Sequence, residues 1–182
     1  NVKLDTKALD INTLMFFGQL KSTTVKKIIY STDDKIKELN EIEFFKSQRN
    51  ATKEILYTLK NIESENISFN GLNFEPQREH LEWIVWRAFL AINSFNNQIK
   101  NTRGFPVDKN FLPIQHSAKD KEDLFFEFDE YCLLVEVTFK TSGSQLKDEV
   151  ESVFRHTVNK IKKYKKKPVY CLFLAPKINI NL

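Results

Sequence analysis

The chain has 182 residues, of which 41% are hydrophobic and 13% aromatic, and it carries a formal net charge of +4 at pH 7. Its four Gly and five Pro against sixteen Phe exclude a low-complexity or disordered chain and favour a helix-rich folded body. This length allows one full hydrophobic core with a smaller appendage.

The N-terminal third of the chain predicts helices. Apolar residues recur at steps of three and four over about residues 7–62, as in Leu14, Phe17, Leu20, Ile36, Leu39 and Ile42. The Asn-Gly pair and the Pro within residues 66–77 then mark a boundary. We expect a helical linker or docking segment over residues 1–75 and a catalytic domain over 76–182.

The second half predicts a mixed α/β order. A helix over 78–95 would place Leu81, Ile84, Val85, Ala88 and Ile92 on one face, with Glu82 beside it. A loop over 101–110 follows. Strands over 123–128 and 131–140 form a β-hairpin around residues 129 and 130, and a helix over about 145–165 leads to a third strand over 168–176.

The predicted hairpin brings two acidic residues together. Glu136 lies inside an apolar strand, where an ionised carboxylate needs a cation, a hydrogen-bonded partner or exposure. Asp123 would lie opposite Glu136, because each is six residues from the turn. Two adjacent carboxylates raise each other's pKa unless a metal ion neutralises them, and magnesium is the natural occupant. From the pattern alone, a hydrated acid pair at the open end of a sheet explains the spacing equally well.

Other features bear on location and partners. No apolar run reaches the roughly 18 residues of a membrane span, and no apolar leader precedes a small-residue cleavage site. Cys132 and Cys171 lie in apolar runs without CxxC spacing, so we expect buried, reduced thiols in a cytoplasmic protein with no membrane contact. The start at Asn1 and the end soon after the last strand suggest a fragment, truncated at its C-terminus.

A basic segment covers residues 155–167, which contain seven Lys or Arg and no acid. It is a candidate for contacts with a polyanion, with the Lys162–Lys167 cluster as a candidate for phosphate contacts. A solvated helix end explains it equally well.

The acids and their surroundings resemble a known family. Glu122-Asp123 followed by Glu136-Val137-Thr138 resembles the PD-(D/E)XK nuclease motif. The segments LEWIVWRAFLAI, VDKNFLPIQHSA, EDLFFEF, LLVEVTF, SQLKDEVESVFRH and YCLFLAPKIN resemble, in order, the AlwI-like branch of type IIS restriction and nicking endonucleases over about residues 78–180. The resemblance implies a restriction-endonuclease-like α/β fold, a mixed sheet flanked by helices. It also implies magnesium-dependent hydrolysis of DNA phosphodiester bonds, with manganese as a substitute.

The resemblance also implies roles for individual residues. Asp123 and Glu136 would be metal ligands together with the backbone carbonyl of Val137. Glu82 would be the additional acid that holds a second metal or a metal-bound water. Glu149 and His156, seven residues apart on one helix face, would orient water or contact the scissile phosphate.

The sequence departs from the general motif at two positions. Glu122 replaces the proline, and Thr138 stands where most of these nucleases have lysine, although the AlwI-like branch also reads Glu-Val-Thr. Water activation then falls to the metal, to Lys140 or to His156. His116 occupies the family's loop histidine without the following glycine, and its role stays open.

The family places sequence recognition in a separate domain, so the expected partners are double-stranded DNA and a missing recognition domain or partner subunit. A dimer is a further candidate arrangement for double-strand cleavage. Two other functions stay open: a catalytically silent module of the same fold that binds DNA or a protein, and an RNA-directed or repair nuclease. The retention of Asp123, Glu136 and Glu82 argues against the silent module.

Overall fold

The computed structural model describes residues 18, 22–63, 67–69, 72–74, 78–93, 100–118, 120–140 and 144–178. The chain divides into two compact units, Asn1–Glu43 and Phe44–Leu182. None of the described helices combines the length and the apolar character that a membrane span requires.

The predicted N-terminal helices are present where the structure describes the chain. They are α2 (Ser22–Ser47), the 3-10 helix η2 (Gln48–Ala51) and α3 (Thr52–Lys60). Residues 7–21 of the predicted helical segment, apart from Gly18, lie outside the described residues. In the second unit, Ile55 and Ile62 belong to the same apolar core as helix α4 (Arg78–Asn93). The expected division at residues 75 and 76 stays a prediction.

A short hairpin that the sequence analysis missed precedes α4. Strands β1 (Ile67–Phe69) and β2 (Leu72–Phe74) pair antiparallel, with the sequence Asn70-Gly71 between them. Asn-Gly is the favoured sequence for a two-residue hairpin connection. The Asn-Gly pair therefore marks not only a boundary but also the strands on either side of it.

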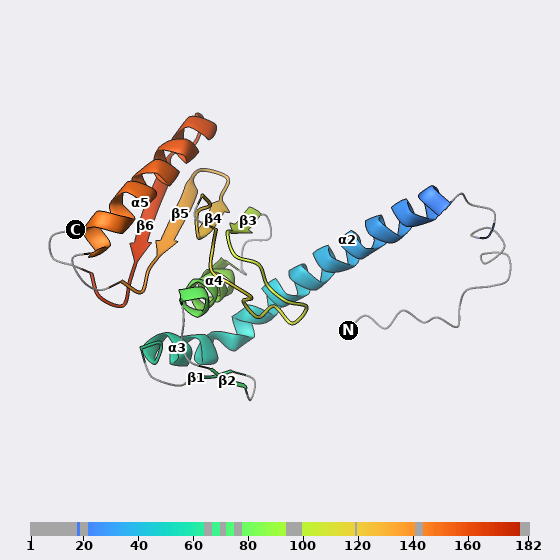
Figure 1. The fold of residues 1–182 in the computed structure, drawn as a ribbon, viewed down its shortest axis with the longest axis horizontal. Coiled ribbons are helices and arrows are strands. Elements are labelled where there is room, and N and C mark those ends of the chain that lie inside the picture. Colours follow the sequence, from blue (N-terminus) through green and yellow to red (C-terminus); the bar gives the residue numbers. More distant parts are fainter. Residues whose placement is uncertain are drawn as a thin grey trace. The chain divides into compact units, whose positions relative to one another are not determined.

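The main sheet has four strands in the order β3-β4-β5-β6 (Figure 1). They are β3 (Lys100–Arg103), β4 (Leu124–Glu127), β5 (Cys132–Val137) and β6 (Val169–Leu174). The first three pair antiparallel, and β6 runs parallel to β5 after helix α5 (Ser144–Lys163). The predicted hairpin, helix and third strand are confirmed. The predicted loop is wrong where β3 pairs with β4, because the polar sequence of this edge strand lacks an apolar alternation.

The register of the hairpin confirms the predicted pairing of the two acids. Leu124 pairs with Val135, so the next positions toward the open end are Asp123 and Glu136. At the other end, the Phe128 amide donates to the Tyr131 carbonyl at 2.9 Å and closes the turn.

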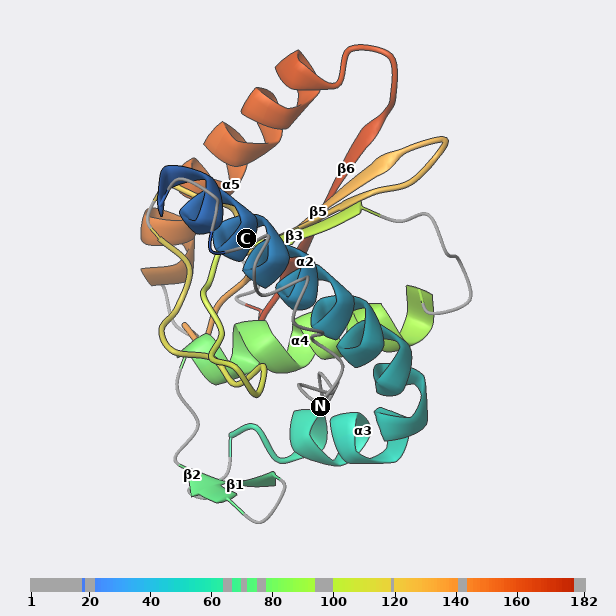
Figure 2. The same ribbon diagram turned by 90° about the vertical axis from the view of Figure 1, so that its right-hand side faces the viewer.

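The sheet separates two helical layers, with α4 on one face and α5 on the other (Figures 1 and 2). Leu124 and Val135 pack in the α4 core, whereas Phe125 and Leu134 pack with Tyr164 just after α5. Because side chains alternate along a strand, Asp123 and Glu136 belong to the α5 face of the sheet. The α4 core contains the largest buried side chains, with Trp83 and Trp86 each 1% exposed.

Two predicted burial assignments are wrong. Ile92 is 66% exposed, because it lies in the last turn of α4, whereas residues 81–87 are buried on every side of the helix. Cys132 is buried but Cys171 is exposed, because β6 is the outermost strand of the sheet. Neither cysteine forms a disulfide.

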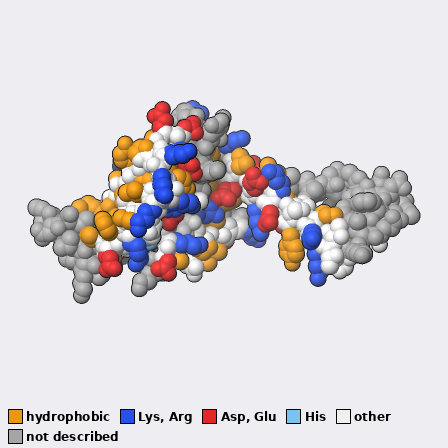
Figure 3. Space-filling model, turned by 90° about the horizontal axis from the view of Figure 1, so that it is seen from above, with side chains coloured by type: hydrophobic (Ala, Val, Ile, Leu, Met, Phe, Trp, Pro, Cys, Tyr) orange, Lys and Arg blue, Asp and Glu red, His pale blue; other side chains and the backbone are white. Residues whose placement is uncertain are grey.

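The end of the molecule where α5 and β6 meet carries a mixed surface. Lys and Arg side chains lie next to exposed hydrophobic side chains in the view from above (Figure 3). The exposed apolar residues of these elements include Phe154, Ile161 and Tyr170. Two lysines of the basic segment are paired: Lys160 contacts the carboxylate of Glu122, and Lys167 donates to Glu127 at 3.0 Å.

Candidate active site

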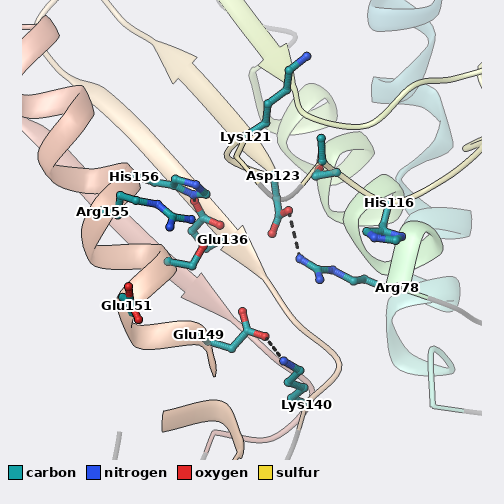
Figure 4. Close-up of a pocket in the computed structure, with 13 residues that line it drawn as sticks. Arg78, His116, Lys121, Asp123, Glu136, Lys140, Glu149, Glu151, Arg155 and His156 are labelled. Carbon is teal, nitrogen blue, oxygen red and sulfur yellow. Dashed lines mark hydrogen bonds and ion pairs between the residues drawn. The ribbon is translucent and has the colours of Figure 1, made fainter. Parts of the chain in front are cut away.

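A cavity of about 600 Å³ lies at the open end of the β4–β5 hairpin (Figure 4). Side chains from α4, α5, the hairpin and the loop before β4 line it. Four carboxylates and four basic side chains line this space: Asp123, Glu136, Glu149 and Glu151, and Arg78, Lys121, Lys140 and Arg155. His116 and His156 also line it, so the structure brings together the predicted residues Asp123, Glu136, Glu149 and His156.

The two central acids are almost fully buried. Asp123 is 2% exposed and Glu136 is 6% exposed. The Val137 amide donates to Asp123 Oδ2 at 2.8 Å, which fixes that carboxylate on the neighbouring strand. Asp123 Oδ1 remains directed toward Arg78, whose Nη2 is 3.7 Å away.

Burial dominates the electrostatics of this pair. It raises the pKa of Asp123 to about 8, and the charges of Glu82 and Glu136 add to the effect. It also raises the pKa of Glu136 to about 8, with Glu122 as the largest charge that adds to it. The fold therefore holds two carboxylates that the surrounding protein charges do not neutralise, which suits a divalent cation.

His156 on α5 contacts Glu136, which lies on the α5 face of the sheet. Its Nδ1 lies 2.8 Å from Glu136 Oε1. Burial, followed by the charge of Arg155, lowers the pKa of His156, so the imidazole is neutral near pH 7. Nδ1 and the Glu136 carboxyl share one hydrogen bond, and either group can be its donor because the pKa of Glu136 is raised to about 8. Within the part of the chain that the structure describes, the buried Nε2 of His156 has no hydrogen-bond partner.

Glu82 on α4 is fully buried beside the cavity and does not line it directly. The Ser117 amide and hydroxyl each donate to its Oε2 at 2.8 Å, and Arg78 Nε donates to its Oε1 at 2.9 Å. Arg78 thus links Glu82 to Asp123. Neither Arg78 nor Ser117 was predicted as a site residue from the sequence. The four-residue step from Arg78 to Glu82 could have indicated the first, whereas no local pattern indicates the second.

Gly104 allows the segments that carry Ser117 and Glu122 to pack closely against its backbone. A Cβ at this position would lie 2.7 Å from Ser117 Oγ and would clash with the Glu122 carbonyl oxygen. The Gly104 amide donates to the Asp123 carbonyl at 2.9 Å. A larger residue here would displace the segments that carry Ser117 and Asp123.

Glu149, Thr138 and Lys140 form a smaller polar group at the cavity rim. Lys140 Nζ lies 3.0 Å from Glu149 Oε1, and the Thr138 hydroxyl lies 3.3 Å from the same oxygen. Thr138, which replaces the motif lysine, is 2% exposed. Because the motif position has no lysine, the ammonium group at this end of β5 comes from Lys140, which lines the cavity.

The donors that could hold a metal ion are few. Among the residues that the structure describes, no group of three or more His, Cys, Asp and Glu side chains is placed to hold an ion. The candidate ligands are the carboxylates of Asp123 and Glu136 and the carbonyl of Val137. A magnesium ion that keeps several waters and takes one or two carboxylates needs no more from the protein.

A four-strand mixed sheet flanked by helices, with paired acids at the open end of its central hairpin, defines the restriction-endonuclease class of fold. The structure is similar to the crystal structure of the small subunit of the heterodimeric restriction endonuclease R.BspD6I. The TM-score is 0.56 at 26% sequence identity, and the match covers 71% of this chain but 62% of that one. The family model of the AlwI restriction endonuclease matches residues 6–182, and the chain belongs to this family. No curated protein sequence matches the chain.

Proposed function

We propose that the chain is a magnesium-dependent endonuclease cleavage domain that hydrolyses DNA phosphodiester bonds as part of a type IIS restriction or nicking enzyme. Membership of the restriction endonuclease family supports a nuclease role. The observation that carries the proposal is the buried pair Asp123 and Glu136, whose pKa values are both raised to about 8. Such a pair is costly to the fold unless a cation neutralises it.

The proposed ligands are Asp123 through Oδ1, Glu136, and the Val137 carbonyl. When bound there, a magnesium ion supplies a Lewis acid for the phosphoryl group and a water of lowered pKa. Asp123 keeps its orientation because its Oδ2 accepts the Val137 amide at 2.8 Å. Glu136 keeps its orientation through His156 Nδ1.

For water activation, the contacts favour His156 over Lys140. His156 lines the cavity and its lowered pKa keeps the imidazole neutral near pH 7, so it is the proposed acceptor of a proton from a water there. Lys140 Nζ is ion-paired with Glu149 Oε1 at 3.0 Å. Glu149 and Lys140 then serve to orient water or the phosphate.

The family resemblance gave Glu82 the role of a ligand to a second metal. In the structure each of its carboxylate oxygens accepts at least one hydrogen bond, from Ser117 or from Arg78. A second ion at Glu82 would therefore share Oε1 with Arg78 or displace the guanidinium. One metal at Asp123 and Glu136 is the simpler arrangement.

The proposed partners are double-stranded DNA and a recognition domain or partner subunit. The structural relative is a subunit of a heterodimeric enzyme, and the match spans 62% of it. We therefore expect weak, poorly specific cleavage from this chain alone, with a dimer or a second subunit needed to cut both strands.

The test is nicking of supercoiled plasmid at low salt by the wild type and Asp123→Ala, with excess EDTA as control. Nicking that requires magnesium and disappears in the variant supports the proposal. A protein that retards DNA on a gel yet cuts with neither magnesium nor manganese would instead be the silent binding module.

A further inference from the structure

Arg78, the first residue of α4, reaches the cavity from the side opposite His156 (Figure 4). Its Nε donates to Glu82 Oε1 at 2.9 Å, and its Nη2 lies 3.7 Å from Asp123 Oδ1, too far for a hydrogen bond. An arginine carries five N–H donors. Within the described segments, only the Nε donor of Arg78 has an acceptor. The Nη edge is thus open to a ligand in the cavity.

The Nε edge, in contrast, is firmly anchored. Glu82 is fully buried, and the Ser117 amide and hydroxyl both hold its other oxygen at 2.8 Å. The carboxylate cannot turn without losing these bonds. Arg78 itself is 42% exposed, so its fixed inner edge and accessible outer edge preorganise the guanidinium.

The charges around the cavity indicate the chemistry of that ligand. Four carboxylates and four basic side chains line it, so a bound dication leaves an excess of positive charge. The same dication neutralises Asp123, the ionic partner that faces the Nη edge of Arg78. A planar pair of N–H donors beside a cation matches a phosphate oxygen pair.

We propose that Arg78 binds a phosphate of the DNA at the cleavage site, and that Glu82, held by Ser117, positions its guanidinium. The inference rests on the proposed function for the identity of the phosphate as DNA. It gives Glu82 a role as a positioning residue rather than a metal ligand.

The test measures binding without cleavage. Calcium replaces magnesium, and fluorescence anisotropy gives the Kd of a labelled duplex over a series of salt concentrations. Arg78→Gln should raise the Kd about tenfold, because it removes a charge-assisted contact. It should also reduce the slope of log Kd against log salt by about one, the value for one phosphate contact.

Matched variants separate this contact from other effects. Arg78→Lys keeps the charge but lacks the Nε donor to Glu82, so it should weaken binding while keeping most of the salt slope. Arg49→Gln removes the same charge from η2, outside the cavity, and should leave both values unchanged. Glu82→Gln should weaken DNA binding and leave the number of bound calcium ions, measured by calorimetry, unchanged.

Each of the following outcomes would contradict one part of the proposal. If Arg78→Gln and Arg78→Lys lower the melting temperature but keep the wild-type Kd and slope, Arg78 is only a structural counter-charge. Loss of one bound calcium ion in Glu82→Gln would make Glu82 a metal ligand. A wild type that binds no duplex refutes the Arg78 contact, whereas a wild type that shows the Arg78 effect but never nicks plasmid refutes only the proposed nuclease.

Discussion

Two groups of buried charge contact helix α4, and the fold balances them differently. Arg87, 2% exposed, donates to Gln48 Oε1 at 2.6 Å and to Glu54 Oε1 at 2.7 Å, and it lies 4.7 Å above the Trp83 ring. Three groups thus surround this cation, although its burial still lowers the pKa of Arg87. At the other end of α4, Arg78 faces a group of carboxylates that outnumber it.

The carboxylate group is not balanced in the same way. Asp123 and Glu136 lie in one cavity with pKa values raised to about 8. The contacts of Arg87 join α4 to α3 and η2. Ionisation of the buried acid pair, in contrast, destabilises the fold, and in our proposal a bound cation offsets this cost. A buried charge with a full set of partners thus indicates structure, and one without them indicates function. Four predictions test this contrast.

The largest effect should follow from Glu136→Gln. The change removes a proposed metal ligand and keeps the size of the side chain, so magnesium-dependent plasmid nicking should fall by roughly a thousandfold. The melting temperature should not fall. Glu38→Gln, on the exposed face of α2, is the matched control and should nick like the wild type. Equal nicking by wild type and Glu136→Gln would remove Glu136 from the site.

Arg87→Met should give the opposite pattern. It leaves buried Gln48 and partly exposed Glu54 without their donor, so the free energy of unfolding in urea should fall by roughly 3 kcal/mol. Nicking per folded molecule should stay at the wild-type level. A variant of normal stability that no longer cuts would erase the distinction between the two groups.

His156→Ala tests how far the acid site depends on its hydrogen-bonded support. Loss of the Nδ1 contact to Glu136 should reduce nicking about 10- to 100-fold, in the range seen for groups that orient metal ligands. If His156 also accepts a proton from water, the slope of nicking rate against pH should flatten in the variant. An unchanged rate and pH profile would contradict both roles.

The smallest effect concerns stability and pH. The Asp123 carboxyl has an ordinary pKa of 3.8 and a pKa of about 8 in the fold, so between these values the folded state holds a proton that the unfolded chain lacks. Stability of the metal-free protein should therefore fall as pH rises from about 4 to about 8. Asp123→Asn should recover at least the ~1.4 kcal/mol of one pKa unit at pH 8. Melting curves in EDTA at pH 5 and pH 8 measure this, and identical wild-type and variant profiles would count against the raised pKa.

The hairpin, α5 and the parallel third strand could be predicted because each depends on local patterns. Alternation and the two-residue turn fix the register, and the register alone places Asp123 opposite Glu136. His156 was predicted only through the family resemblance. The residues next to it in the sequence do not indicate its contact with Glu136, because the two lie on different elements.

The missed features depend on contacts between distant segments. Ser117 reaches Glu82 across 35 positions of the chain, and β3 is a strand only because β4 lies beside it. The exposure of Cys171 follows from the place of β6 at the sheet edge, which its apolar sequence does not reveal. Such features follow from topology rather than from periodicity.

The most direct test of the acid site is binding of manganese, followed by its electron paramagnetic resonance signal, at pH 8. We expect saturable binding by the wild type, weaker binding at pH 5 where protons compete, and at least tenfold weaker binding by Asp123→Asn. Equal manganese affinity of wild type and Asp123→Asn would show that the buried acids are not the metal site.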